Sequence, residues 1–107
     1  MSSIPTSVRV KIRARDRGQC LRCGGVGTEL QHRVRRREGG HHLWNLVTMC
    51  GTCHRTWAHA NPDAAREGGW IISVHHQDPA SVPLHTFWGE WVRLTADGLL
   101  EKASPPL

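Results

Sequence analysis

The stretches Cys20-Leu21-Arg22-Cys23 and Cys50-Gly51-Thr52-Cys53 hold all four cysteines of this chain in two Cys-x-x-Cys units. Two such units are the usual way to present four thiolates at the corners of a tetrahedron, which is the geometry that zinc prefers. Two disulfides are the alternative, but the chain has no apolar stretch long enough for a signal peptide or a membrane span. We therefore expect reduced cysteines that bind one structural Zn²⁺ ion: Cys20, Cys23, Cys50 and Cys53.

The composition fits one small, basic domain over residues 1–107. Hydrophobic residues make up 38% of the chain and tyrosine is absent. The core should therefore be thin, and a metal that closes a long loop would stabilise it. Lys and Arg number 14 against 9 Asp and Glu, which gives a net charge of +5. Clustered positive charge is typical of proteins that bind a polyanion, and no membrane partner is expected.

Periodicity and turn residues outline the elements of the first two thirds. Residues 1–7 should be a flexible lead-in. Residues 8–17 should form a short helix capped by Ser7 and stopped by Gly18, although a strand fits their alternation of apolar and basic side chains equally well. The next expected elements are strands over 29–34 and 46–48, a loop at 39–40, a helix over 51–60, and a helix over 63–67 with Asn61 as its cap.

The last third of the chain should be a β-rich extension over residues 70–103. We expect a strand over 70–74, then a hairpin whose strands over 88–95 and 99–101 flank the turn at 96–98, and a tail over 104–107. Large aromatic side chains should fill the core or its margin: Trp57, Trp70, Trp88 and Trp91.

A second pattern lies between and just after the cysteine pairs: Gln31-His32-Arg33, Gly39-Gly40, Asn45-Leu46 and Cys53-His54. In this order and spacing, over roughly residues 18–62, the chain resembles the HNH endonuclease family, and in particular its small members from actinobacteria and their phages. The resemblance implies a ββα-metal module, in which a two-stranded hairpin and a helix grip one divalent cation. The expected fold class is therefore α+β, a zinc-stapled ββα-metal module with short helices and a C-terminal β-hairpin.

The resemblance also implies roles for three residues. His32 matches the general base that takes a proton from the attacking water, a task that suits a group titrating near neutral pH. Asn45 matches the residue that shapes the hairpin loop, fixes the base or touches the metal, and His54 matches a metal ligand. Taken alone, the same residues could be a structural histidine, a turn residue and a helix-stabilising histidine.

Two positions depart from the family pattern. Many relatives have Asp or His directly before the base, where this chain has Gln31, a neutral and weaker ligand. Some relatives have a ligand four residues after the last motif histidine, whereas His59 lies five residues after His54. On an ideal helix these two histidines are about 140° apart, and a π-bulge would bring them together. Otherwise the loop residues His41 or His42 could supply the ligand. The catalytic cation could be Mn²⁺, Ni²⁺, Mg²⁺ or Zn²⁺.

The basic residues after the first strand could hold DNA phosphates or form a solvated surface: Arg33, Arg35, Arg36 and Arg37. The function that we expect is metal-dependent hydrolysis of DNA phosphodiester bonds, in the cytoplasm of a bacterium or of a phage-infected cell. The alternatives are a non-catalytic zinc-stapled DNA-binding module, or an accessory nuclease of a phage packaging motor. The resemblance implies terminase or portal proteins as partners in that last case.

Overall fold

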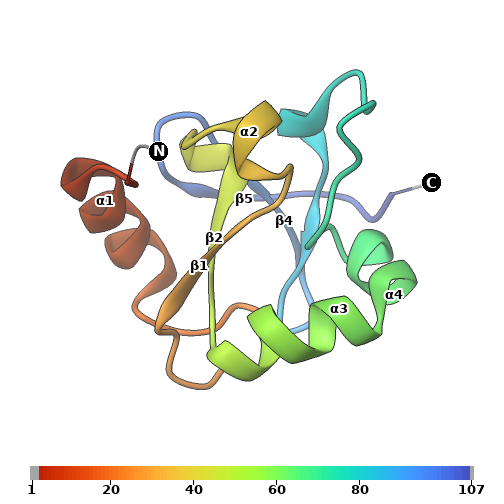
Figure 1. Cartoon of the computed structure of the whole chain (residues 1–107), viewed down its shortest axis with the longest axis horizontal. Coiled ribbons are helices and arrows are strands. Elements are labelled where there is room, and N and C mark those ends of the chain that lie inside the picture. Colours follow the sequence, from red (N-terminus) through yellow and green to blue (C-terminus); the bar gives the residue numbers. More distant parts are fainter. Residues whose placement is uncertain (1–2, 107) are drawn as a thin grey trace.

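The computed structural model describes residues 3–106, in which short helices surround two small antiparallel sheets (Figure 1). The helices are α1 (Thr6–Asp16), α2 (Arg36–Gly39), the 3-10 turn η1 (Leu43–Asn45), the π-helix η2 (Thr52–Trp57), α3 (Ala58–Ala60), α4 (Pro62–Glu67) and the 3-10 turn η3 (Pro79–Ser81). One sheet pairs β1 (Glu29–His32) with β2 (Leu46–Met49), and the other contains β3 (Leu84–His85), β4 (Trp91–Leu94) and β5 (Leu100–Lys102). The expected α+β class is confirmed.

The β1–β2 hairpin runs through the middle of the molecule, with α1 on one side and the η2–α3 helix at one end (Figure 1). The two strands pair with His32 opposite Leu46 and Glu29 opposite Met49. β1 ends earlier than expected, because after Arg33 the Asn45 side chain binds both the N–H and the carbonyl of Val34, and the chain then turns into α2. The short helix α2 occupies part of what the sequence predicted to be a loop.

Helix α1 docks on strand β2 through a buried ion pair. The Arg15 guanidinium pairs with Asp16 (Nε–Oδ1 2.7 Å) and donates to the backbone oxygens of Leu43 and Leu46 (2.7 and 2.6 Å). The other oxygen of the carboxylate accepts the Thr48 N–H (3.0 Å). The helix, rather than the strand, is therefore confirmed for this segment, and its junction with the sheet is polar.

The start of the chain differs from the expectation. Helix α1 begins at Thr6, with Pro5 as its N-cap residue, so Ser7 lies inside the helix and gives no side-chain cap; the Pro5 carbonyl accepts the N–H groups of Val8 and Arg9 (both 3.1 Å). Ile4 is buried against the apolar side of the helix. The expected flexible lead-in is thus already packed at this point, and residues 1–2 lie outside the described residues.

The segment over 70–74 is not a strand, which corrects the expectation. The N–H groups of Ile71 and Ile72 donate to Ala65 O (3.2 Å) and Arg33 O (2.9 Å). The segment is therefore tied to the end of α4 and to the hairpin, and no strand ladder forms. Further on, the β4–β5 hairpin is confirmed, with Gly98 at φ +90° in its turn.

The tryptophans divide between core and surface. Trp70 is buried in the main apolar cluster, and Trp57 and Trp91 are half-buried. Trp88 is 43% exposed, so the expectation of a core position is wrong for this residue. Within the described residues, no helix has the length and apolar character needed to cross a membrane.

Arg33 is one of the largest fully buried side chains, only 1% exposed. Its guanidinium donates to three backbone oxygens, those of Gly69 (2.8 Å), Trp44 (3.1 Å) and Val82 (2.6 Å). It therefore joins the hairpin to the C-terminal half of the chain. The expectation that Arg33 contacts DNA is corrected, because its donors are already satisfied inside the protein.

We predict that Arg33→Met lowers the free energy of unfolding by about 2–4 kcal/mol, because one buried and two partly buried carbonyls lose their donor. The same substitution at the exposed Arg37 should change it by less than about 0.5 kcal/mol. Urea unfolding of both zinc-loaded variants measures this difference. Equal stability of the two variants would contradict the structural role of Arg33.

Candidate metal centres and active site

The four cysteines converge on one point. Their sulfur atoms all lie within 4.8 Å of one another, and Cys23 Sγ and Cys50 Sγ are 3.8 Å apart. Zn–S bonds of about 2.3 Å at tetrahedral angles also place sulfur atoms about 3.8 Å apart. All four are free thiols, so the disulfide alternative is not favoured. The cluster can hold a metal ion, and its chemistry and size fit zinc.

Local backbone and side-chain contacts hold the two cysteine pairs in shape. The Cys20 N–H donates to Gly25 O (2.7 Å), which closes the first turn, and the Cys53 N–H donates to Cys50 Sγ (3.4 Å). This N–H is the main reason why the pKa of the Cys50 thiol is lowered to about 7. Arg22 donates to Cys53 Sγ (3.3 Å) and stacks on the Trp57 ring. Burial nevertheless raises the pKa of the Cys53 thiol to about 12, and the hydrogen bond from Arg22 opposes this shift by favouring the thiolate.

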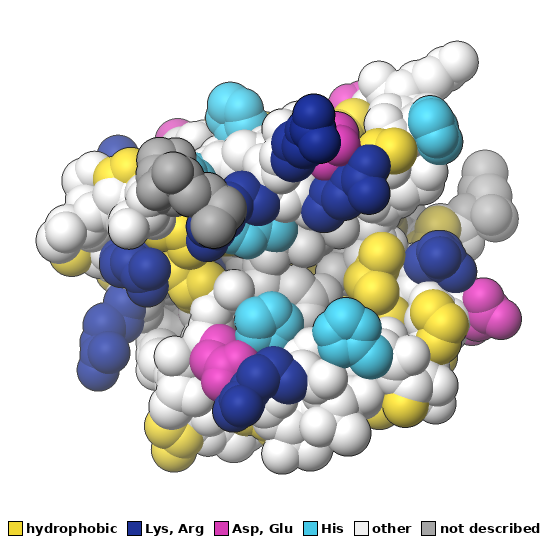
Figure 2. Space-filling model, viewed as in Figure 1, with side chains coloured by type: hydrophobic (Ala, Val, Ile, Leu, Met, Phe, Trp, Pro, Cys, Tyr) yellow, Lys and Arg dark blue, Asp and Glu magenta, His cyan; other side chains and the backbone are white. Residues whose placement is uncertain are grey.

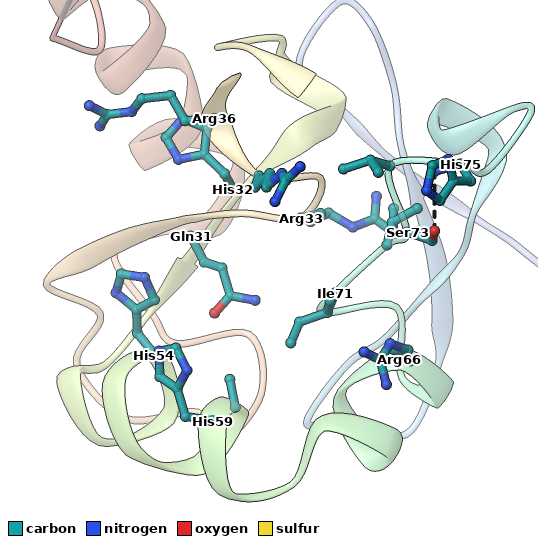
Figure 3. A pocket seen from close by; sticks show the side chains of 14 residues that line it. Gln31, His32, Arg33, Arg36, His54, His59, Arg66, Ile71, Ser73 and His75 are labelled. Atoms are coloured by element: carbon teal, nitrogen blue, oxygen red, sulfur yellow. Dashed lines mark hydrogen bonds between the residues drawn. The ribbon is translucent and has the colours of Figure 1, made fainter. Parts of the chain in front are cut away.

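The helix that follows the second cysteine pair is a π-helix. The Ala58 N–H donates to Cys53 O, five residues back, instead of four. In this winding, residues five apart lie about one turn from each other. His54 and His59 consequently line the same pocket, and Figure 3 shows their rings beside each other. The π-bulge considered for this segment is therefore present.

Gln31 projects from β1 toward these two histidines. The side chain is 5% exposed, and its Nε2 donates to Trp70 O, which fixes the orientation of the amide. Its Oε1 has no hydrogen-bond partner and is turned toward His54 and His59 (Figure 3). A buried acceptor without a partner is costly, so this oxygen is suited to a ligand that approaches from the pocket.

Glu29 fixes the ring of His54 from the side of β1. The His54 Nδ1 lies 2.7 Å from Glu29 Oε1, and Arg55 Nη2 lies 3.0 Å from Glu29 Oε2. The hydrogen bond from His54 is the largest of the effects that lower the pKa of Glu29. Because Nδ1 is occupied, Nε2 is the nitrogen that His54 can offer to a metal, an arrangement common among metal-binding histidines.

His32 lies at the end of β1, with its ring on the opposite side of the strand from Gln31 (Figure 3). Its Nε2 is 3.0 Å from His41 Nδ1, and the two rings are tilted against each other. Burial, followed by the charge of Arg36 and the neighbouring His41 and His54, lowers the pKa of His32 to about 4. The ring is therefore neutral at pH 7 and can accept a proton, but it is a weaker base than the group titrating near neutral pH that the sequence led us to expect.

Asn45 is fully buried and shapes the loop between β1 and β2. Its Oδ1 accepts the Val34 N–H (2.7 Å), and its Nδ2 donates to Val34 O (2.8 Å) and Gly40 O (3.0 Å). A Cβ atom on Gly39 would collide with the same amide group. Of the three roles considered for Asn45, its contacts favour the shaping of the loop.

The pocket around these groups has a volume of about 650 Å³ and is open on one face. Figure 2 shows histidines around a hollow, with Lys and Arg side chains on several sides of it. Arg35 and Arg36 line this pocket, whereas Arg37 is exposed outside it. His42 stacks on Trp44 (5.4 Å between ring centroids), so the alternative of a metal ligand from this residue is not favoured.

The far wall of the pocket was missed by sequence reasoning. It is formed by Arg66 of α4 and by the segment from Ile71 to His75. No local pattern marks these residues, because their position depends on how α4 packs against the hairpin. The pairing of His41 with His32 was missed for a similar reason.

Among the described residues, only the four cysteines bring three or more His, Cys, Asp or Glu ligands together. A second metal site would thus need Gln31 beside the two histidines.

Comparison with known proteins leaves these conclusions to the geometry alone, since no family model, curated protein or solved structure matches the chain.

We predict that Cys50→Ser removes most of the bound zinc and leaves the chain largely unfolded, because the binding energy of such a site is folding energy. Thr52→Ser is the matched control, since Thr52 is exposed between the same two cysteines. Metal content and thermal unfolding check both variants. Loss of zinc with an unchanged thermal transition would refute a structural role.

We also predict that, without added divalent cation, His32 titrates near pH 4 in an NMR experiment. An unfolded histidine titrates near about 6.5. Between these values the unfolded chain binds more protons than the folded one, so stability should fall as the pH falls through this window. His32→Gln should lose less stability over the same range. A His32 titration near its ordinary pKa would contradict the described environment.

Proposed function

We propose that this protein is a metal-dependent DNA endonuclease of the HNH type. The observation that supports it most is the π-helix, because it brings His59 beside His54, in front of the unpartnered Gln31 oxygen. His59 lies five residues after His54 instead of the four seen in some HNH proteins, and the wider π-helical winding compensates for the extra residue. π-Bulges occur frequently at functional sites.

The order of elements supports the same proposal. Strand β1, strand β2 and the η2–α3 helix follow one another in the chain, and β1 contacts η2 in space. The proposed base comes from the end of β1, Asn45 from the loop between the strands, and the metal ligands from β1 and the helix. This is the arrangement that a ββα-metal module requires. The cysteine cluster joins the segment before β1 to the junction between β2 and the helix.

Each residue has a definite task in the proposed reaction. His54, His59 and Gln31 would hold the divalent cation, which when bound stabilises negative charge on the scissile phosphate and the departing oxygen. His32 would accept the proton of the attacking water, and His41 would hold the ring of His32 in its orientation. Glu29 would keep the Nε2 of His54 directed at the cation.

The ligand set supports a preference among metals. Imidazole nitrogens and an amide oxygen without a charged carboxylate suit a transition metal better than Mg²⁺. We therefore expect Mn²⁺ or Ni²⁺ to support activity better than Mg²⁺, with weaker binding than that of zinc at the four thiolates. The carboxylate of Glu29 contacts the Nδ1 of His54 rather than the proposed cation, and its negative charge is partly neutralised by Arg55.

Charge around the pocket supports DNA as the substrate. Arg36 lies beside His32, and Arg66 stands across the pocket from it (Figure 3). Arginine pairs with phosphate oxygens two at a time and is suited to hold the backbone on both sides of a scissile bond. Such contacts position the strand without reading its sequence.

The test is cleavage of supercoiled plasmid with Mn²⁺, Ni²⁺ or Mg²⁺. His32→Ala should cleave on the order of a hundredfold more slowly while it still binds DNA. His54→Ala should lose activity while zinc remains bound, and His59→Ala should need more Mn²⁺ for the same rate. His76→Ala is the control, because His76 is an exposed histidine outside the pocket.

The outcomes separate the proposal from its rival. Full activity of His32→Ala, with contaminating nuclease excluded, would refute the proposed base. An unchanged Mn²⁺ requirement in both His54→Ala and His59→Ala would refute the metal site. DNA binding without cleavage under any metal would favour the non-catalytic zinc-stapled module instead.

A further inference from the structure

A second groove lies beside helix α1 and the start of the β1–β2 hairpin. It has a volume of about 210 Å³, and its walls come from the helix, the first cysteine loop and the start of the hairpin. The lining residues with side-chain charge are Arg9, Arg13 and Glu29, and the remaining wall includes Gly18, Gly27 and Thr48. Neither arginine belongs to the motif that the proposed nuclease function uses.

Arg9 and Arg13 carry positive charge that no acidic side chain neutralises among the described residues. They stand four residues apart on α1 and therefore share one side of the helix. The Nε of Arg9 donates to Ile4 O (3.3 Å), which leaves its terminal nitrogens free, and the Arg13 guanidinium makes no hydrogen bond in the part of the chain that the structure describes. Glu29 is engaged by His54 and Arg55 instead.

A polar group on the wall also lacks a partner. Thr48 is 4% exposed, and its Oγ1 has no hydrogen-bond partner among the described residues. Gly27 lies directly against this residue, because a Cβ at Gly27 would collide with the Thr48 methyl group. The hydroxyl oxygen is itself buried, so the donors that the groove offers to an anion with several oxygens are its two guanidinium groups.

The groove adjoins the candidate catalytic pocket. Glu29 lines the groove, and its carboxylate contacts His54, which lines the pocket. Figure 2 shows Lys and Arg side chains beside α1 on the same face as the histidines of the hollow. A chain of phosphates that crosses the pocket could therefore continue into the groove, and a second cationic site of this kind is suited to a polyanion rather than to a single small anion.

We propose that Arg9 and Arg13 hold a backbone phosphate of bound DNA, on the α1 side of the phosphate that lies at His54. The placement next to a scissile phosphate depends on the proposed nuclease function, whereas DNA binding by the groove does not. The guanidinium groups supply the charge and paired hydrogen bonds, and they contact no base. The groove would thus raise affinity for DNA of any sequence and fix the path of the strand over the histidines.

The experiment measures binding of one labelled duplex by the zinc-loaded protein over a series of salt concentrations, without added divalent cation. The double variant Arg9→Gln/Arg13→Gln should bind about tenfold more weakly at low salt, with a log–log salt slope reduced by roughly one unit per lost phosphate contact. Lys11→Gln/Arg17→Gln is the control, because it removes the same charge from exposed positions of the same segment that do not line the groove.

Three further measurements make the outcome decisive. Thermal unfolding should be the same for both double variants, and Arg9→Lys/Arg13→Lys should recover part of the affinity. In cleavage with Mn²⁺, the groove variant should show a raised KM and a nearly unchanged kcat. If the groove variant and the control lose affinity and salt dependence equally, the groove is not a phosphate site. If neither protein cleaves DNA but the groove variant alone binds poorly, the groove proposal stands and the nuclease proposal fails.

Discussion

The convergence of four cysteine sulfurs on one point, where they can hold a metal ion, is the constraint on which the rest of this structure depends. Cys23 and Cys50 are 27 positions apart in the chain, and the β1–β2 hairpin lies between them. A chain with so thin a core gains most from closing this long loop. Once the loop is closed, the start of β1 and the start of the helix after Cys53 are held side by side. The pocket forms where these two segments meet.

The π-helix shows how the structural and the candidate catalytic site share one helix. Cys53 faces the sulfur cluster, and the next residue, His54, faces the pocket. The wider winding then lets His59 reach the same side as His54 without displacing Cys53. Buried polar side chains also hold the segments around the pocket together, since Arg33 and Asn45 form hydrogen bonds with backbone groups. Arg33, which in the sequence looks like a contact for DNA phosphate, therefore has a structural role because it is buried.

The sequence predicted the features that local chemistry determines. Cysteine spacing indicated the metal cluster, turn residues indicated the β4–β5 hairpin, and the start of α4 followed from Pro62. Features that depend on packing between distant segments could not be predicted. Arg33 looked like part of a surface run, but its position beneath the C-terminal half buries it. The segment over 70–74 has the composition of a strand, yet its N–H groups at Ile71 and Ile72 are bound to Ala65 O and Arg33 O. The wall of the pocket depends on the same packing.

A crystal structure of the protein grown with Mn²⁺, with anomalous scattering measured at the zinc and manganese edges, tests the central claim most directly. The account predicts zinc at the four cysteine sulfurs and one manganese ion bound by the Nε2 of His54, a ring nitrogen of His59 and the Oε1 of Gln31. Manganese bound elsewhere, or absent while zinc occupies the cysteines, would contradict the claim that the π-helix builds a second metal site.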